Sequence, residues 1–199
     1  MFIVIDGPDG SGKTTLAMGL ASRLQQDGIS TIYTYEPTYE SKAGKELRRL
    51  MKIGGITDLY AFADLFVVDR KEHIKSLIVP ALERGEYIVC DRYKYSALAY
   101  QQLQGVSAEY LVEINKECLI PNIAFILMPK EVDVLLHRIL DRGKDQEIFE
   151  EKEFLSRTLE FYKKLPSYFP DEQIIFLEAE DSVKENIEKV IGYLSDKEK

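Results

Sequence analysis

The sequence has only two cysteines and two histidines among its 199 residues. Cys90 and Cys118 lie in apolar segments without C-x-x-C spacing, so both thiols are expected to be buried and reduced, as in a cytoplasmic protein. His73 and His137 are far apart, and each lies in a helical pattern. This argues against a metal site built on histidine and favours surface or packing roles.

Long apolar runs, an excess of positive charge and low-complexity tracts are also absent. No apolar run approaches the roughly 20 residues of a membrane-spanning helix, and residues 1–6 are typical of a strand rather than a signal peptide. The formal net charge of −8 argues against general binding of nucleic acid, which requires a basic surface. No repeat or Pro-, Gly- or Ser-rich linker divides the chain, so residues 1–199 are expected to form a single domain.

Short runs rich in Ile, Val and Phe alternate with helical patterns along the chain. Strands are predicted at Phe2–Asp6, Thr31–Tyr35, Tyr87–Cys90, Ile123–Leu127 and Ile174–Leu177. Helices are predicted at about residues 13–26, 42–52, 57–84, 95–104, 107–118, 131–141, 151–165 and 182–195. Continuous apolar strands separated by helices are typical of a parallel sheet covered on both faces. We therefore expect an α/β fold, a three-layer sandwich with a five-stranded parallel sheet, whose ligands bind beyond the carboxyl ends of the strands.

The strongest motif follows the first predicted strand. Residues 7–14 read Gly-Pro-Asp-Gly-Ser-Gly-Lys-Thr, which fits the phosphate-binding pattern G-x-x-x-x-G-K-[ST] between a strand and a helix. Glycines let backbone N–H groups surround phosphate oxygens, and the N-terminus of the following helix adds its positive dipole end. Lys13 would reach the β- and γ-phosphates, and the Thr14 hydroxyl would bind Mg²⁺. The motif predicts binding of a nucleoside triphosphate.

Further polar residues follow a later strand and lie on the long helix. Asp91 ends an apolar strand and is suited to hold phosphate-bound Mg²⁺ through water, although an acid at a strand end is a weak signal alone. Arg92 comes next, where a guanidinium can bind a phosphate or form a surface ion pair. Phe66 and Arg70 lie one helical turn apart, which suits either a planar base or the core. Beside a P-loop on the same sheet, the strand-end pair predicts a phosphate and metal site.

These motifs together resemble the thymidylate kinase family of nucleoside monophosphate kinases. The resemblance covers nearly the whole chain, and the string D-R-Y-x-x-S-x-x-A-Y-Q at residues 91–101 is far more specific than a P-loop. Its other parts are the P-loop G-P-D-G-S-G-K-T-T, Glu36-Pro37, Phe66-x-x-x-Arg70-x-x-His73, Ala179-x-x-Ser182 and an arginine-bearing segment at 138–150. The resemblance implies ATP- and Mg²⁺-dependent phosphorylation of dTMP to dTDP, a step of dTTP synthesis. It also implies a homodimer packed through helices, with the nucleotides ATP and dTMP as its small-molecule partners.

The resemblance assigns residues to four roles. The implied catalytic residues are Asp9, Lys13, Arg92 and Arg142. ATP would be bound by Gly7, Asp9, Gly10, Ser11, Gly12, Lys13, Thr14, Thr15, Arg138, Arg142 and the backbone at Ala179, which would meet adenine. The acceptor would be bound by Asp9, Glu36, Pro37, Phe66, Arg70, Arg92, Ser96, Tyr100 and Gln101, and Mg²⁺ by Thr14 and Asp91.

Within the acceptor set, the resemblance implies a contact for each part of dTMP. Phe66 would stack on thymine, and Arg70 would donate to its O4. Asp9 would face the 3′-hydroxyl, while Tyr100 would crowd the 2′ position and so favour deoxyribose. Arg92 would bind the acceptor phosphate. These roles agree with phosphoryl transfer, which requires positioning and neutralisation of charge rather than covalent catalysis.

Within the P-loop, Gly10 indicates which subtype of the family the chain resembles. Gly10 stands where some family members have an arginine, and members without it resemble the bacterial type, in which a lid supplies the basic residues. A lid is expected at about residues 138–153, where Arg138 and Arg142 lie four apart on a predicted helix and face one way. The polar run 142–153 is also typical of a solvated loop, and Arg138 is equally placed to pair with an acid on its own helix.

Two departures from the family pattern fall on the acceptor side. Tyr35 stands where many members have an arginine before Glu-Pro, and Ala97 stands where several have an asparagine that touches the base. Arg48 or Arg49 on the next helix would restore the missing charge. The departures leave a broader-specificity nucleoside monophosphate kinase as an alternative.

Three other functions share the P-loop. A GTPase requires an N-K-x-D motif after a late strand, whereas Asn115-Lys116-Glu117-Cys118 lacks the aspartate and precedes its strand. A deoxynucleoside kinase needs a general base for a neutral 5′-hydroxyl, while the arginines here favour an acceptor that already carries a phosphate. A non-catalytic nucleotide-binding partner is the third alternative, and the intact Lys13, Thr14 and Asp91 argue against it.

Overall fold

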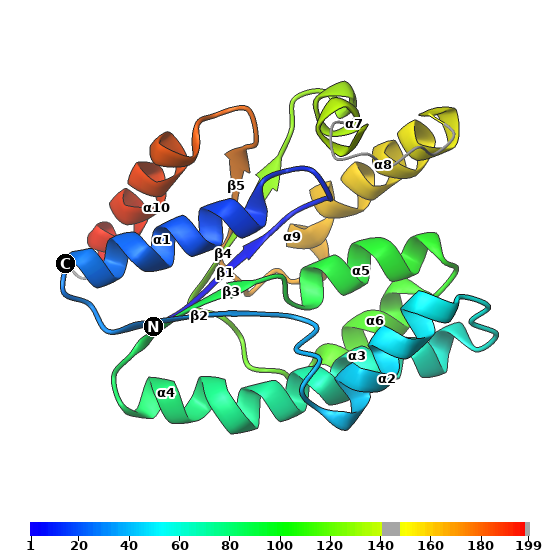
Figure 1. The fold of residues 1–199 in the computed structure, drawn as a ribbon, viewed down its shortest axis with the longest axis horizontal. Coiled ribbons are helices and arrows are strands. Elements are labelled where there is room, and N and C mark those ends of the chain that lie inside the picture. Colours follow the sequence, from blue (N-terminus) through cyan, green and yellow to red (C-terminus); the bar gives the residue numbers. More distant parts are fainter. Residues whose placement is uncertain (141–147, 198–199) are drawn as a thin grey trace.

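A parallel sheet lies at the centre of the structure, a computed structural model that describes residues 1–140 and 148–197. Its strands run in the order β2-β3-β1-β4-β5 (Figure 1), which confirms the expected five-stranded parallel sheet. They are β1 (Phe2–Asp6), β2 (Thr31–Tyr35), β3 (Tyr87–Asp91), β4 (Ile123–Met128) and β5 (Ile174–Glu178). The last three each extend one residue beyond the prediction.

Helices cover both faces of this sheet, as the continuous apolar strands predicted. On one face lie α1 (Lys13–Gln26) and α10 (Val183–Lys197), and on the other lie α3 (Leu59–His73), α4 (Val79–Glu83), α5 (Lys94–Leu103) and α6 (Ala108–Asn115). Ile3 and Ile5 belong to the core under α1 and α10, whereas Val4 belongs to the opposite core. Successive side chains of a strand point to opposite faces, so the central strand β1 contributes to both cores.

The pairing of β1 with β3 brings two distant motifs to one edge of the sheet. Ile5 lies beside Asp91 in the register, and the Arg92 backbone N–H donates to the Ile5 carbonyl at 2.9 Å. The P-loop therefore leaves β1 at the same level at which Asp91 and Arg92 leave β3. This is the edge where parallel α/β sheets bind ligands.

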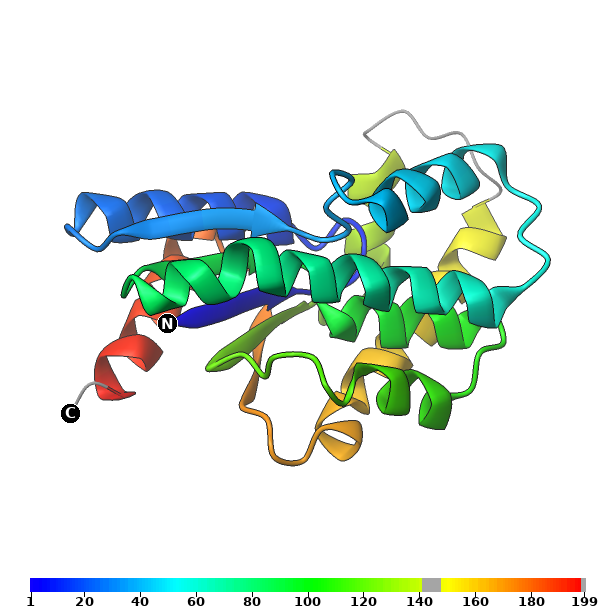
Figure 2. The ribbon, with the colours of Figure 1, turned by 90° about the horizontal axis from the view of Figure 1, so that it is seen from below.

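The predicted helix at 57–84 forms one long rod, which passes in front of the sheet in the view of Figure 2. The rod consists of α3, a π-helical turn at Ile74–Ile78 and α4. Asp58 begins it by accepting a hydrogen bond from the Ala61 N–H at 2.9 Å, as an N-cap residue does. The wide turn ends just before Pro80, which has no N–H to donate to the preceding turn.

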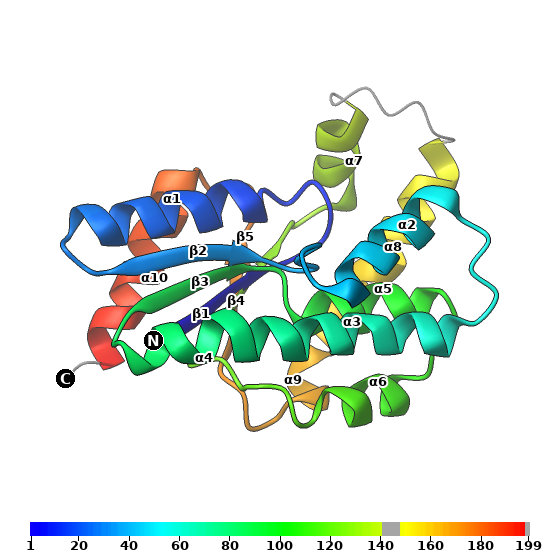
Figure 3. The same cartoon turned by 60° about the horizontal axis from the view of Figure 1, so that its bottom comes forward.

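The remaining helices are α2 (Lys42–Ile53), α7 (Val132–Leu140), α8 (Ile148–Lys163) and α9 (Leu165–Tyr168). Figure 3 shows α2, α5 and α8 gathered beyond the carboxyl ends of the strands. Residues 148–153 lie in α8, so the solvated-loop interpretation is wrong for this part because the helix begins earlier than predicted. The short helix α9 was not predicted. Within the described chain, no helix has the length and hydropathy needed to cross a bilayer.

Candidate active site

Gly7 begins the P-loop, at a position where no side chain fits. Its φ is 146°, and a Cβ atom here would lie 2.6 Å from the carbonyl oxygen of Leu127 in β4. Gly12 ends the loop at φ 95°, a left-handed conformation that glycine adopts without the usual strain. The helix α1 follows directly, so its unpaired N–H groups face the loop.

Lys13 curls back over the loop from the first turn of α1. Its Nζ donates to the Pro8 carbonyl at 3.2 Å and lies 3.4 Å from the Asp9 carboxylate. The residue is 5% exposed. Burial, together with the charge of Arg92, lowers the pKa of Lys13. The ammonium is held where phosphates on the P-loop would meet it.

Thr14 and Asp91 form an oxygen-rich pair next to this loop. The Thr14 hydroxyl donates to Asp91 Oδ2 at 2.5 Å. Asp91 Oδ1 is buried and has no hydrogen-bond partner among the described residues. Burial raises the pKa of Asp91. Hydroxyl and carboxylate oxygens are the ligands that Mg²⁺ prefers, so this pair fits the predicted metal site.

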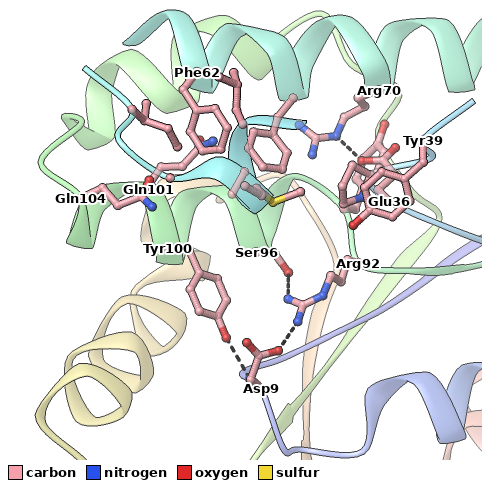
Figure 4. Close-up of a pocket in the computed structure, with 18 residues that line it drawn as sticks. Asp9, Glu36, Tyr39, Phe62, Arg70, Arg92, Ser96, Tyr100, Gln101 and Gln104 are labelled. Atoms are coloured by element: carbon pink, nitrogen blue, oxygen red, sulfur yellow. Dashed lines mark hydrogen bonds and ion pairs between the residues drawn. The ribbon is translucent and has the colours of Figure 1, made fainter. Parts of the chain in front are cut away.

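A pocket of about 470 Å³ opens beside the P-loop. The residues that line it include every predicted acceptor-side residue: Asp9, Glu36, Pro37, Phe66, Arg70, Arg92, Ser96, Tyr100 and Gln101. They come from the P-loop, the ends of β2 and β3, α3 and α5, and the close-up in Figure 4 labels most of them. The fold thus brings together residues that are distant in the sequence.

Arg92 lies at the mouth of the pocket nearest the P-loop. It forms an ion pair with Asp9, and its Nη1 donates to Ser96 Oγ at 3.0 Å (Figure 4). The Asp9 N–H donates to the Tyr100 hydroxyl at 2.8 Å. Burial alone would raise the pKa of Asp9, but Arg92 and Lys13 outweigh it and hold that pKa below its ordinary value. Arg92 has φ 68°, an unusual conformation outside glycine that points to a functional constraint.

Arg70 is held deep in the pocket by two side chains. Its Nε donates to Glu36 at 2.7 Å and its Nη1 donates to Asn115 at 2.5 Å. Arg70 is 2% exposed and lines the pocket. Phe66 lies one turn away, edge-on to Phe62 with ring centroids 5.2 Å apart. The pocket therefore offers an aromatic face beside a fixed donor.

Glu36 is supported in turn by His73. The His73 Nδ1 lies 3.2 Å from Glu36, and Nε2 lies 2.8 Å from the Thr34 hydroxyl. Ligand atoms of Glu36, His73 and Cys90 all lie within 4.8 Å of one another. A metal ion here would compete with Arg70 for Glu36 and leave a buried charge unpaired, so we assign the cluster to the support of Arg70. Cys90 and Cys118 are free and buried, as predicted.

Sequence reasoning missed residues whose placement depends on the loop between β2 and α2. Asp69 accepts hydrogen bonds from the Thr38 N–H at 2.8 Å and from the Ser41 hydroxyl at 2.6 Å. These bonds hold Tyr39 at the pocket with φ 66°. The Glu36-Pro37 peptide bond is cis. The spacing of Asp69 on the helix was visible, but nothing in the sequence identified its partners.

The two departures from the family pattern differ in position. Ala97 lines the pocket, whereas Tyr35 is 39% exposed and is not among the lining residues. The guanidinium of Arg48 lies 4.0 Å from the centre of the Tyr39 ring, while Arg49 pairs with Glu46 on its own helix. Arg48 is therefore the better candidate for the missing charge.

Arg138 connects the P-loop with the residue expected at adenine. Its Nη2 donates to the Ala179 carbonyl at 3.0 Å, and Nη1 lies 3.4 Å from the Ser11 carbonyl. The described residues of α7 provide no acidic partner for it. Arg142 and the segment 141–147 of the expected lid lie outside the described residues.

A phosphate loop next to a deep pocket with its own arginines, on a parallel sheet of order 2-3-1-4-5, defines a nucleotide kinase. The sequence model of the thymidylate kinase family matches residues 5–191. The chain belongs to the thymidylate kinase family, whose activity is transfer of a phosphoryl group from ATP to dTMP, giving dTDP.

Individual relatives agree with this membership. A probable thymidylate kinase of Pyrococcus horikoshii is 39% identical over 179 residues, which cover 87% of this chain and 86% of that protein. The thymidylate kinase of Brachyspira hyodysenteriae is 34% identical over 195 residues, covering 98% and 93%. The crystal structure of thymidylate kinase from Ehrlichia chaffeensis has a TM-score of 0.76, with 24% identity and 98% of both chains covered, and so shares the fold.

Proposed function

We propose that the pocket bounded by Phe66, Arg70 and Arg92 is the dTMP site, and that the P-loop is the adjoining ATP site. The observation that carries this proposal is the position of Asp9. Its carboxylate pairs with Arg92 on the pocket side and lies 3.4 Å from Lys13 on the P-loop side. The two cations that would hold the acceptor and donor phosphates therefore share one counter-ion.

On the donor side, the backbone N–H groups of the P-loop and the N-terminus of α1 would bind the ATP phosphates. Lys13 would pair with the β- and γ-phosphates, and Arg138 would hold the loop against Ala179, near adenine. Thr14 and Asp91 would hold Mg²⁺, which neutralises charge on the phosphate oxygens when bound. Lid arginines, Arg142 among them, would add positive charge there.

On the acceptor side, the base would stack on Phe66 and accept a hydrogen bond from Arg70. Gln101 Nε2 is buried without a partner among the described residues, so it is available to the acceptor. Tyr100 would lie against the sugar, and Arg92 would bind the phosphate. Arg48 would supply charge where Tyr35 does not, and the small Ala97 leaves the base pocket wider than an asparagine would.

The reaction then needs no covalent intermediate. An oxygen of the acceptor phosphate attacks the γ-phosphorus of ATP, the bond to the β,γ-bridging oxygen breaks, and ADP leaves. Lys13 and Arg92 neutralise charge on either side of the transferred group. A low pKa makes Asp9 a weak base, so the site is poorly suited to activating the neutral hydroxyl of a nucleoside. This favours a monophosphate acceptor over the alternative of a deoxynucleoside kinase.

We also propose that the chain acts as a homodimer in the cytoplasm. The family resemblance supports the dimer, and the two free, buried cysteines fit a reducing compartment.

Replacement of Arg92 by glutamine tests the acceptor assignment. The variant is expected to lose at least about tenfold in affinity for dTMP, because the phosphate loses a charged partner. Its affinity for thymidine, which has no phosphate, is expected to stay the same. Isothermal titration with both ligands measures this, and equal loss for both would contradict the assignment.

A further inference from the structure

Asp6 is a fully buried carboxylate that lies behind both halves of the site. Its Oδ1 accepts from the Gly7 N–H at 2.7 Å, at the start of the P-loop. Its Oδ2 accepts from the N–H groups of Tyr93 at 3.0 Å and Ser96 at 3.1 Å, at the start of α5. The hydroxyl of Ser96 also donates to Oδ1. One carboxylate thus fixes the backbone that follows Arg92 and the entry to the P-loop.

Tyr162 reaches this carboxylate from a different part of the chain. It lies on α8, is 0% exposed, and its hydroxyl is 2.9 Å from Asp6 Oδ1. The same hydroxyl is 3.2 Å from Ser96 Oγ. Burial, together with the charge of Asp6, raises the pKa of Tyr162 far above its ordinary value, so the hydroxyl keeps its proton. It remains a hydrogen-bond donor at all physiological pH values.

The hydroxyl of Tyr162 restricts the orientation of the Ser96 hydroxyl. Ser96 has one proton, which it gives to Asp6, and its oxygen accepts from Arg92 Nη1 at 3.0 Å. With Tyr162 in place, Asp6 Oδ1 accepts from the Tyr162 hydroxyl as well as from the Ser96 hydroxyl. Ser96 Oγ is then oriented to accept from Arg92. Without the Tyr162 hydroxyl, Asp6 Oδ1 keeps only the Gly7 N–H and the Ser96 hydroxyl as donors among the described residues. Ser96 Oγ also loses the neighbouring hydroxyl at 3.2 Å, so its orientation towards Arg92 is less constrained.

We infer that Tyr162 is a positioning residue that holds Arg92, through Ser96 and Asp6, in the orientation that binds the acceptor phosphate. The inference rests on the proposed role of Arg92. It assigns a function in acceptor binding to α8, whose Phe154 also touches Tyr100 with ring centroids 5.9 Å apart. Because Tyr162 would act only on the phosphate contact, loss of its hydroxyl should weaken the binding of dTMP but not the binding of thymidine.

The test is the ratio of the affinities for dTMP and thymidine in the variant Tyr162→Phe, measured by isothermal titration on the full chain. Tyr162→Phe keeps the buried ring and removes only the hydroxyl. We expect a roughly fivefold weaker binding of dTMP with unchanged binding of thymidine, because an indirect contact costs less than the charged one it orients. Tyr95→Phe is the matched control, since Tyr95 is also 0% exposed and its hydroxyl donates to a carboxylate, Glu172, at 2.6 Å.

The affinity ratios distinguish a positioning role of Tyr162 from a role in packing or stability. An unchanged ratio in Tyr162→Phe, or the same change of ratio in Tyr95→Phe, would overturn the inference, since the loss would then be one of packing or stability. In a Ser96→Ala background, Tyr162→Phe should have no further effect on the ratio, and an additive effect would refute the route through Ser96. An unchanged ratio in Arg92→Gln would instead overturn the proposed acceptor site itself.

Discussion

At the scale of single residues, the buried Asp91 carboxylate lowers stability when it is ionised, although the ionised form is the one suited to bind Mg²⁺. Because burial raises its pKa, the folded protein keeps the proton to a higher pH than the unfolded chain, whose value is about 3.9. Stability conferred by this group is therefore present at low pH and is lost as pH rises through the raised folded-state pKa. Above that folded-state pKa, the ionised carboxylate lowers the stability of the nucleotide-free protein.

Asp91→Asn should accordingly raise the Tm of the nucleotide-free protein at pH 7, while kcat with ATP and Mg²⁺ falls by at least about tenfold. Each 1 kcal/mol corresponds to about 2–4 °C in a protein of this size. Calorimetry at pH 7 and at pH 4 measures the effect, which should shrink at the lower pH. A lower Tm for the variant at pH 7 would show that the charges of Lys13 and Arg92 already compensate the buried carboxylate.

The site residues that the sequence could predict are those whose chemistry is local. Lys13 and Thr14 follow from the P-loop pattern, and Asp91 from its place at a strand end. Asn115 orients Arg70 from another helix, and Asp6 joins the P-loop to α5. Such contacts are made by tertiary structure, so no spacing in the chain predicts them.

At the scale of elements, the P-loop depends on its close approach to β4. Gly7→Ala should reduce ATP affinity by at least about tenfold and lower the Tm, because the added Cβ would meet the Leu127 carbonyl at 2.6 Å. Gly28→Ala is the matched control, since Gly28 also has a positive φ of 85° but has nothing within 4 Å of its Cβ position. That variant should cost about 1–2 kcal/mol of stability for backbone strain alone and leave ATP binding unchanged. Equal effects of the two changes on ATP affinity would contradict the role of the close contact.

Element boundaries were predictable where periodicity and end signals agreed. The helix α1 begins and ends as the sequence indicated, since Gly12 and the polar turn after Gln26 bound it. The π-helical turn at Ile74–Ile78 was not predicted, because the apolar pattern of the long helix continues through it. The four-residue helix α9 is too short to have a periodicity of its own.

The whole molecule is expected to be a homodimer. Phe62 and Ala63, on the apolar face of the long helix, are buried within the chain at 4% and 0% exposed, so they are not available to a dimer interface. Val68, farther along α3, is 52% exposed and is the better candidate. Sedimentation equilibrium should give a mass about twice the 22.9 kDa of one chain. Val68→Lys should shift that mass towards one chain, and a wild-type monomer would refute the dimer.

The most direct test of the central claim is the release of ADP from ATP and Mg²⁺ with dTMP, dUMP, dCMP, dAMP, dGMP, UMP and thymidine as separate acceptors. The pocket formed by Phe66, Arg70, Tyr100 and Arg92 predicts that dTMP is the preferred acceptor and that thymidine is not used. Comparable rates with several monophosphates would show that the small Ala97 has opened the pocket. Binding of ATP without turnover of any acceptor would contradict the account of this site as a dTMP kinase.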